Sequence, residues 1–149
     1  ITPLLESPLA FRTVCQSLVQ RYSSQGIDKV IGIDARGFVF AAVIAYELSC
    51  GLVLARKKGK LPEPTIKQAY VLEYGSHQME IQPEAIKQQD RLLIIDDVVA
   101  TGGTLSATIN LVTTLGGEVV ECACVMEILS LNGRQQLESR HGLFSLLTY

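Results

Sequence analysis

The stretch that decides the fold is RLLIIDDVVATGGTL, residues Arg91–Leu105. It starts with a run of leucine and isoleucine, which is typical of a strand buried on both faces of a sheet. Two adjacent carboxylates, Asp96 and Asp97, follow this run, and a small loop then opens the next helix. In parallel α/β sheets, ligands bind at the carboxyl ends of the strands. The stretch therefore predicts a binding site that combines both acids with the loop.

The loop itself is suited to a phosphate monoester. Its glycines carry no side chains, so backbone N–H groups can approach the phosphate, and the start of the following helix adds further N–H groups and a positive dipole end. The candidate phosphate-binding residues are Ala100, Thr101, Gly102, Gly103 and Thr104.

The two aspartates need a different partner, because they would repel a phosphate placed beside them. A ribose diol fits, since its hydroxyls donate hydrogen bonds to carboxylates. The segment matches neither the G-x-x-x-x-G-K-[ST] nor the G-x-G-x-x-G phosphate loop. An ordinary strand–turn–helix connection with surface acids is the alternative, and it leaves the combination of features unexplained.

Strands alternate with helices along the rest of the chain, which predicts an α/β fold with a mainly parallel sheet. The predicted strands are Lys29–Ile33, Leu52–Ala55, Tyr70–Tyr74, Met79–Ile81, Leu92–Ile95, Val119–Met126 and Leu143–Leu147. The predicted helices are Pro8–Tyr22, Phe38–Leu48, Thr104–Leu115 and a short one at Asn132–Glu138. The basic, proline-containing segment Lys57–Ala69 is predicted to be a loop.

Size and composition limit the class of protein. The 149 residues predict a single domain, residues 1–149, and because the chain begins at Ile1 without a methionine we expect an N-terminal segment of the full protein to be missing. No apolar run reaches the ~18 residues of a membrane span. The net charge of −2 argues against general nucleic-acid binding. The four cysteines predict reduced thiols and a cytoplasmic location.

The acid pair and its loop resemble the phosphoribosyl pyrophosphate motif of the type I phosphoribosyltransferases. Four further segments resemble the adenine-specific members of that family: GIDARGFVFA (Gly32–Ala41), ARKKGKLP (Ala55–Pro62), YVLEYG (Tyr70–Gly75) and MEI (Met79–Ile81). The resemblance covers nearly the whole chain. It implies the type I fold, a mainly parallel twisted sheet flanked by helices, with a flexible hood hairpin over the site. It also implies transfer of the 5-phosphoribosyl group from phosphoribosyl pyrophosphate to adenine, giving AMP and pyrophosphate in purine salvage.

The resemblance assigns two segments to pyrophosphate. In the first, Ala35 and Arg36 would bind it across a cis peptide bond between Asp34 and Ala35, and Arg36 would also be catalytic. In the second, Arg56, Lys57 and Lys60 would bind it, whereas composition alone would equally suggest a solvated run of charges. In related enzymes the Lys60 region can come from the neighbouring subunit, so we expect a homodimer.

The resemblance also assigns the base side of the site. Glu73, in the hood hairpin, would face adenine N7 as a catalytic acid, although by itself it suggests an exposed salt-bridging glutamate. The residues expected near the adenine plane are Phe38, Tyr74, Ile128 and Leu129. Apolar residues at these positions are equally expected in a core. The family also covers adenine with an N-terminal segment that precedes the ITPLL stretch and is absent here.

The implied cofactor is Mg²⁺, held mainly by the substrate, so no protein cage of metal ligands is expected. The implied partners are adenine and phosphoribosyl pyrophosphate, without nucleic acid or membrane. One alternative is another phosphoribosyltransferase, for xanthine, hypoxanthine or orotate. A second is a non-catalytic regulator that binds phosphoribosyl pyrophosphate, and such a sensor need not keep Arg36, the Arg56–Lys60 cluster or Glu73.

Overall fold

The computed structural model describes residues 1–71, 76–137 and 141–149. The strands in these residues are β1 (Lys29–Ile33), β2 (Gly51–Lys57), β3 (Ile66–Val71), β4 (Ser76–Ile81), β5 (Arg91–Val99), β6 (Glu118–Glu127) and β7 (Leu143–Thr148). The helices are α1 (Thr2–Glu6), α2 (Pro8–Tyr22), α3 (Gly37–Glu47) and α4 (Gly103–Thr114), with 3₁₀ turns η1 (Pro83–Ala85), η2 (Leu129–Leu131) and η3 (Gly133–Gln136).

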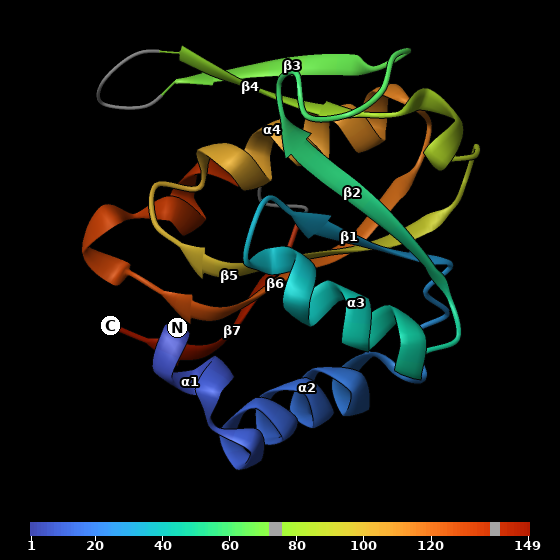
Figure 1. The fold of residues 1–149 in the computed structure, drawn as a ribbon. Helices are drawn as coiled ribbons and strands as arrows, with labels where there is room; N and C mark the ends of the chain where they lie inside the picture. Colours follow the sequence, from blue (N-terminus) through green and yellow to red (C-terminus); the bar gives the residue numbers. More distant parts are fainter. Residues whose placement is uncertain (72–75, 138–140) are drawn as a thin grey trace.

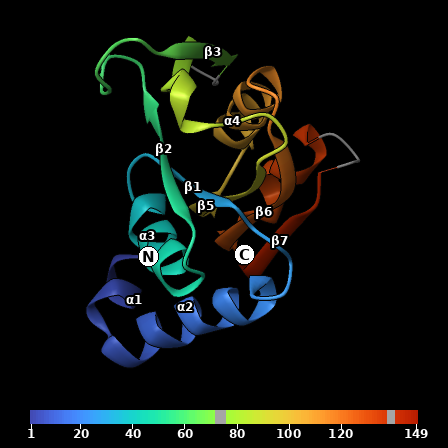
Figure 2. The same ribbon diagram turned by 90° about the vertical axis from the view of Figure 1, so that its right-hand side faces the viewer.

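The strands form one sheet in the order β3-β4-β2-β1-β5-β6-β7. The five strands from β2 to β7 in this order are parallel, and β3 and β4 join the edge of β2 as an antiparallel hairpin. This hairpin lies over α4, which covers one face of the sheet, while α3 and α2 cover the other (Figures 1 and 2). The predicted α/β fold with a mainly parallel sheet is therefore confirmed.

The prediction of a long loop over Lys57–Ala69 was wrong at both ends. β2 continues to Lys57, and β3 already begins at Ile66, paired with Ile81 of β4. The polar residues in the first half of β3 hide its strand character, and hydrogen bonding to β4 overrides the local composition. The irregular segment is accordingly limited to residues 58–65.

The sheet separates two apolar clusters, and β5 contributes to both. Leu92 and Ile94 pack in the cluster with α4, whereas Leu93 and Ile95 pack in the cluster with α2 and α3. All four side chains are fully buried, and each contributes roughly 1.5–3 kcal/mol relative to leaving it exposed. The strand predicted to be buried on both faces is thus the centre of the fold, and it carries the acid pair at a fixed position.

Helix α2 begins as its sequence predicts and is fastened at its other end. The Ser7 side chain accepts a hydrogen bond from Ala10 N, with Pro8 at the first helical position. At the far end, the buried Tyr22 hydroxyl donates to Glu121 Oε2 on β6 at 2.6 Å. Arg21 donates to the same carboxylate. The helix is therefore attached to the sheet by a polar cluster as well as by its apolar face.

All four cysteines are free thiols, and Cys15, Cys122 and Cys124 are buried. Among the described residues, no helix is both long enough and apolar enough to cross a membrane.

Candidate active site

The carboxyl ends of β1, β5 and β6 lie along one edge of the sheet, on the left in Figure 1. Asp96 and Asp97 lie on β5 at this edge and are 7% and 5% exposed. Asp97 N donates to Asp96 Oδ1 at 2.8 Å. Burial and the neighbouring Asp97 carboxylate raise the pKa of Asp96 well above its usual value. A ligand that donates hydrogen bonds or carries positive charge would stabilise the ionised pair.

The loop after β1 reaches this acid pair. The Asp34–Ala35 peptide bond is cis, as the resemblance implies. Arg36 then forms an ion pair with Asp97, 61 residues away in sequence, while more than half of its side chain remains exposed. A Cβ on Gly37 would lie 2.8 Å from Ile95 O, so only glycine lets α3 begin this close to β5. The structure therefore brings Arg36 and the acid pair together.

The predicted phosphate loop lies between β5 and α4. Gly102 has φ +81°, a left-handed conformation that favours glycine. The 12-residue helix α4 begins at Gly103, one residue earlier than predicted, so its first N–H groups, which have no partner within a helix, point toward the loop. Thr101 and Thr104 are half-buried beside the glycines, and Ala100 precedes them. The loop thus has the geometry of an anion site.

A second glycine, Gly133, packs against the backbone of this loop. A Cβ on Gly133, in η3, would lie 2.2 Å from Ala100 O, and one on Gly102 would lie 2.5 Å from Gly133 O. The turn that carries Gly133 is held by Arg134, which binds the buried Glu127 at the end of β6 through two nitrogens. The two loops therefore pack backbone to backbone.

The basic cluster, which comprises Arg56, Lys57, Lys58 and Lys60, begins at the end of β2. Arg56 Nε lies 3.3 Å from Asp34 Oδ2, and the guanidinium lies 5.7 Å from the centre of the Phe38 ring. The three lysines are exposed. Lys57 and Lys58, with His77 and Gln78, line a pocket of about 370 Å³. Arg56 thus connects the basic cluster to the Asp34–Arg36 loop.

The expected base side is only partly described. Phe38 and Ile128 are half-buried, and Leu129 is exposed. Ile128 N donates to Val99 O at 2.9 Å, which places the start of the η2 segment beside the end of β5. Glu73 and Tyr74 lie outside the described residues.

Three further residues belong to this edge of the sheet or support it; sequence reasoning named Asp34 only for its cis peptide bond and did not single out Glu80 or Gly133. Asp34 joins the two pyrophosphate-assigned segments, Glu80 accepts hydrogen bonds from the loop after β2, and Gly133 supports the phosphate loop. Asp34 and Glu80 do occur inside the quoted GIDARG and MEI segments. No local pattern distinguishes them, because their partners are distant in sequence.

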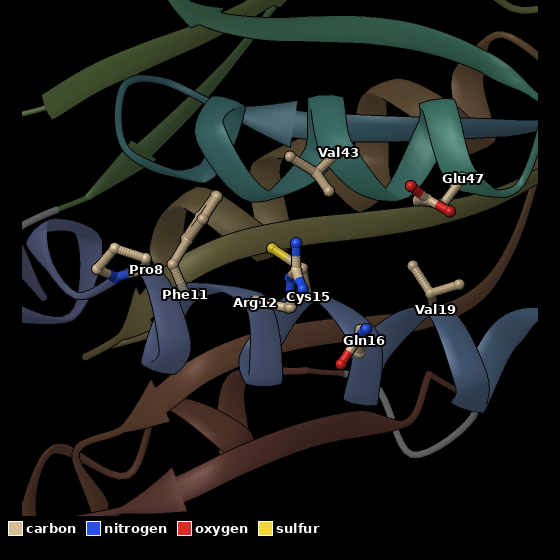
Figure 3. Close-up of a pocket in the computed structure, with 8 residues that line it drawn as sticks. All are labelled: Pro8, Phe11, Arg12, Cys15, Gln16, Val19, Val43 and Glu47. Carbon is tan, nitrogen blue, oxygen red and sulfur yellow. The ribbon is translucent and has the colours of Figure 1, made fainter.

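A larger groove lies elsewhere. It has a volume of about 470 Å³ and runs between α2 and α3, where Phe11, Cys15 and Val19 face Val43 and Glu47 (Figure 3). It contains none of the predicted site residues. Within residues 1–71, 76–137 and 141–149, no group of three or more His, Cys, Asp or Glu side chains could hold a metal ion.

Comparison with known proteins agrees with this geometry. Residues 2–148 match the family model described as a phosphoribosyl transferase domain. The adenine phosphoribosyltransferase of Desulfosudis oleivorans is 48% identical over 149 residues, which is 100% of this chain and 86% of that protein.

Two solved structures are similar as well. The adenine phosphoribosyltransferase of Rhodothermus marinus superimposes with a TM-score of 0.96 at 44% identity, covering 100% of this chain and 85% of that one. The enzyme of Saccharomyces cerevisiae, complexed with an imino-altritol bisphosphate and adenine, gives 0.90 at 36% identity, covering 97% and 84%.

Proposed function

The chain belongs to the adenine phosphoribosyltransferases, and from this premise we propose which of its residues carry out the reaction. The reaction transfers the 5-phosphoribosyl group from phosphoribosyl pyrophosphate to adenine, giving AMP and pyrophosphate, and serves purine salvage. One observation carries the assignment of residues: the buried Asp96–Asp97 pair lies directly before a glycine loop that opens α4.

The loop from Ala100 to Thr104 holds the 5′-phosphate. Its support is the left-handed Gly102, the helix start at Gly103 and the half-buried threonines. Asp96 and Asp97 hold the ribose hydroxyls one sugar length away. As the bond to pyrophosphate breaks, positive charge builds on the ribose ring, and the two carboxylates stabilise it electrostatically. Positive charge on the sugar lowers the raised pKa of Asp96 and so favours its ionised form.

Pyrophosphate leaves well only if its charge is neutralised. We assign this task to Ala35 N–H, Arg36, Arg56, Lys57 and Lys60. Arg36 is held by Asp97 and is largely exposed, so a diol that binds Asp97 frees the guanidinium to turn toward pyrophosphate. Mg²⁺, held mainly by the hydroxyls and phosphates of the substrate, would add to this neutralisation. The described residues fit a metal held in this way, since they offer a buried acid pair for the sugar whose hydroxyls would hold the ion.

Adenine lies between Phe38 and the Ile128–Leu129 segment, with Tyr74 beside it. Adenine N9 attacks the sugar carbon C1′ as the bond from C1′ to pyrophosphate breaks, and the N9 proton passes to water. Glu73 donates a hydrogen bond or a proton to N7, and it recovers that proton when AMP is released. An acid in this role works best with a pKa near neutrality.

The enzyme acts as a homodimer in the cytoplasm. The support for the dimer is a set of four exposed apolar side chains on two elements in contact, which we call the α3–β2 face: Val39, Tyr46, Leu52 and Leu54. Val39 and Tyr46 are seven residues apart on one side of α3, and Leu52 and Leu54 share the face of β2 that contacts this helix. Exposed apolar patches of this kind mark protein interfaces. The free cysteines support a reducing compartment.

Pyrophosphate release is the direct test. The purified chain is assayed with phosphoribosyl pyrophosphate, Mg²⁺ and each of adenine, guanine and hypoxanthine. We expect release with adenine only, and AMP as its product. A preference for another base would show a different phosphoribosyltransferase. Tight binding of phosphoribosyl pyrophosphate without release from any base would show a regulator.

A further inference from the structure

Glu80 is a charged residue without solvent exposure. It lies on β4, in register with Arg56 on β2, and its residue surface is 0% exposed. A carboxylate buried this deeply is destabilising unless it is paired or hydrogen-bonded. The donors that stabilise it are therefore a structural requirement of the fold.

All of these donors come from the segment that follows β2. Lys60 N and Leu61 N each donate to Glu80 Oε1 at 2.9 Å, and Thr65 Oγ1 lies 3.3 Å from Oε2. The nearby Gly59 amide also lowers the pKa of Glu80. The carboxylate thus binds the backbone of the turn that contains Lys60.

The same turn is held from its other side. Arg56 Nη1 donates to Lys60 O at 3.0 Å, and Arg56 Nε in turn approaches Asp34. The backbone of Lys60 is therefore fixed at its N–H by Glu80 and at its carbonyl by Arg56. Gly59, at φ +81° with open space around its Cα, permits the turn.

The basic cluster also lies close to this negative charge. It places four cations within five residues, and these repel one another when no anion is bound. Burial works against ionisation of Glu80, but the amide hydrogen bonds outweigh it and lower its pKa. The carboxylate therefore stays ionised under the turn at neutral pH and offsets part of the repulsion.

We propose that Glu80 is a positioning residue for the pyrophosphate end of the substrate, because its buried carboxylate fixes the backbone of residues 59–61 and so aims the basic cluster. This inference rests on the assignment of Arg56, Lys57 and Lys60 to pyrophosphate made above. It makes Glu80 act through the loop and not through contact with any substrate.

Two conservative variants of Glu80 separate the effect of side-chain length from the effect of side-chain charge. Glu80→Gln keeps the length of the side chain: its amide oxygen can accept from both backbone N–H groups, and its NH₂ can face Thr65 Oγ1. Glu80→Asp keeps the charge but is one methylene shorter, so it cannot reach both amides in the present geometry. The readouts are the KM values for phosphoribosyl pyrophosphate and adenine in the forward reaction, and for pyrophosphate and AMP in the reverse reaction.

For Glu80→Asp we expect KM for phosphoribosyl pyrophosphate and for pyrophosphate to rise by at least about tenfold, since small misplacements of binding groups have effects of this size. KM for adenine and AMP should stay within about twofold. Glu80→Gln should stay within about threefold for all four substrates. Equal changes for all substrates, no change with Asp, or a Gln variant worse than Asp would overturn the proposal.

Lys60→Ala tests directly whether the basic cluster binds the pyrophosphate group. If it raises KM for phosphoribosyl pyrophosphate while Glu80→Asp does not, the Glu80 inference is wrong and the site assignment stands. If Lys60→Ala and Arg56→Ala both leave that KM unchanged, the assignment of the cluster to pyrophosphate is wrong, and the inference about Glu80 fails with it.

Discussion

Asp97 is the residue at which the sugar and pyrophosphate sides of the proposed site meet, because it is one of the two proposed diol ligands and also forms an ion pair with Arg36. Asp97→Asn keeps its shape and removes its charge. We expect KM for phosphoribosyl pyrophosphate to rise and kcat to fall. A hydrogen bond to a charged group contributes about 1.5–3 kcal/mol, so kcat/KM should drop roughly 10- to 100-fold.

The control for this variant is Glu118→Gln, an acid-to-amide change at the opposite end of the sheet, where the exposed Glu118 pairs with Arg91. It should leave both constants unchanged. Near-normal kinetics of Asp97→Asn would count against the diol assignment.

For Glu73 we expect a change in kcat and little change in substrate binding. An amide cannot protonate adenine N7, so Glu73→Gln should lower kcat with little loss of phosphoribosyl pyrophosphate binding. General acid catalysis typically contributes about 100-fold or more, which sets the expected size of the effect. Steady-state kinetics and equilibrium binding measure the two quantities. Glu84→Gln, at an exposed position in η1, is the control, and an unchanged kcat for the Glu73 variant would remove Glu73 from the acid role.

At the scale of elements, η3 packs closely against the phosphate loop. This contact predicts that only glycine is tolerated at Gly133. A Cβ there meets a backbone oxygen, Ala100 O, which has no flexible side chain to move away. Gly133→Ala should therefore displace the loop, destabilise the fold by about 1–3 kcal/mol and raise KM for phosphoribosyl pyrophosphate. Urea unfolding and steady-state kinetics measure both effects.

Gly142→Ala is the matched control, because the nearest atom to its Cβ is a side-chain atom, Glu121 Oε1, at 3.1 Å, and not a backbone oxygen at 2.2 Å. It should cause a much smaller change in both measurements. If Gly133→Ala binds phosphoribosyl pyrophosphate like wild type, η3 does not support the loop.

The attachment of α2 to β6 predicts a pH dependence of stability. Burial works against ionisation of Glu121, but hydrogen bonds from Arg21 and Tyr22 outweigh it and lower its pKa. The cluster therefore contributes its full stability above the pKa of an unfolded glutamate, about 4.3, and loses it as the pH falls through the lower folded-state value. Tyr22→Phe should destabilise the protein by about 1.5 kcal/mol at neutral pH.

This difference in the free energy of unfolding between wild type and Tyr22→Phe should become smaller below about pH 4, because Glu121 becomes protonated. Unfolding curves at several pH values measure it. In a Glu121→Gln background the difference should lose its pH dependence, and a difference that persists unchanged at pH 3 would contradict the role of the carboxylate.

Across the whole molecule, the sequence predicted what depends on local signals. The apolar run of β5, the glycines after it and the Ser7–Pro8 helix start each act within a few residues, and the structure confirms all three. The sequence could not predict contacts between residues that are distant along the chain and are brought together by the fold. Arg36 and Asp97 are 61 residues apart, and Lys60 and Glu80 are 20 apart. Such contacts exist only once β1, β2, β4 and β5 are in register.

The α3–β2 face predicts the assembly state. A charge there would be buried unpaired in the proposed dimer, so Tyr46→Glu or Leu54→Glu should shift the measured mass in light scattering from about twice 16.3 kDa to the monomer value of 16.3 kDa. Leu147→Glu changes a comparably exposed leucine on β7, at the opposite edge of the sheet, and should remain dimeric. A monomeric wild type would contradict the dimer.

Mixing variants decides whether Lys60 acts in its own site or its partner's. Lys60→Ala and Asp97→Asn should each retain at most about a tenth of the wild-type activity alone. If Lys60 acts across the dimer, a mixed dimer has one site with both residues intact. Half of the dimers in an equal mixture are mixed and half of their sites are complete, so about a quarter of the wild-type activity should return. No recovery after subunit exchange would place Lys60 in its own site, where Glu80 and Arg56 of the same chain hold its backbone.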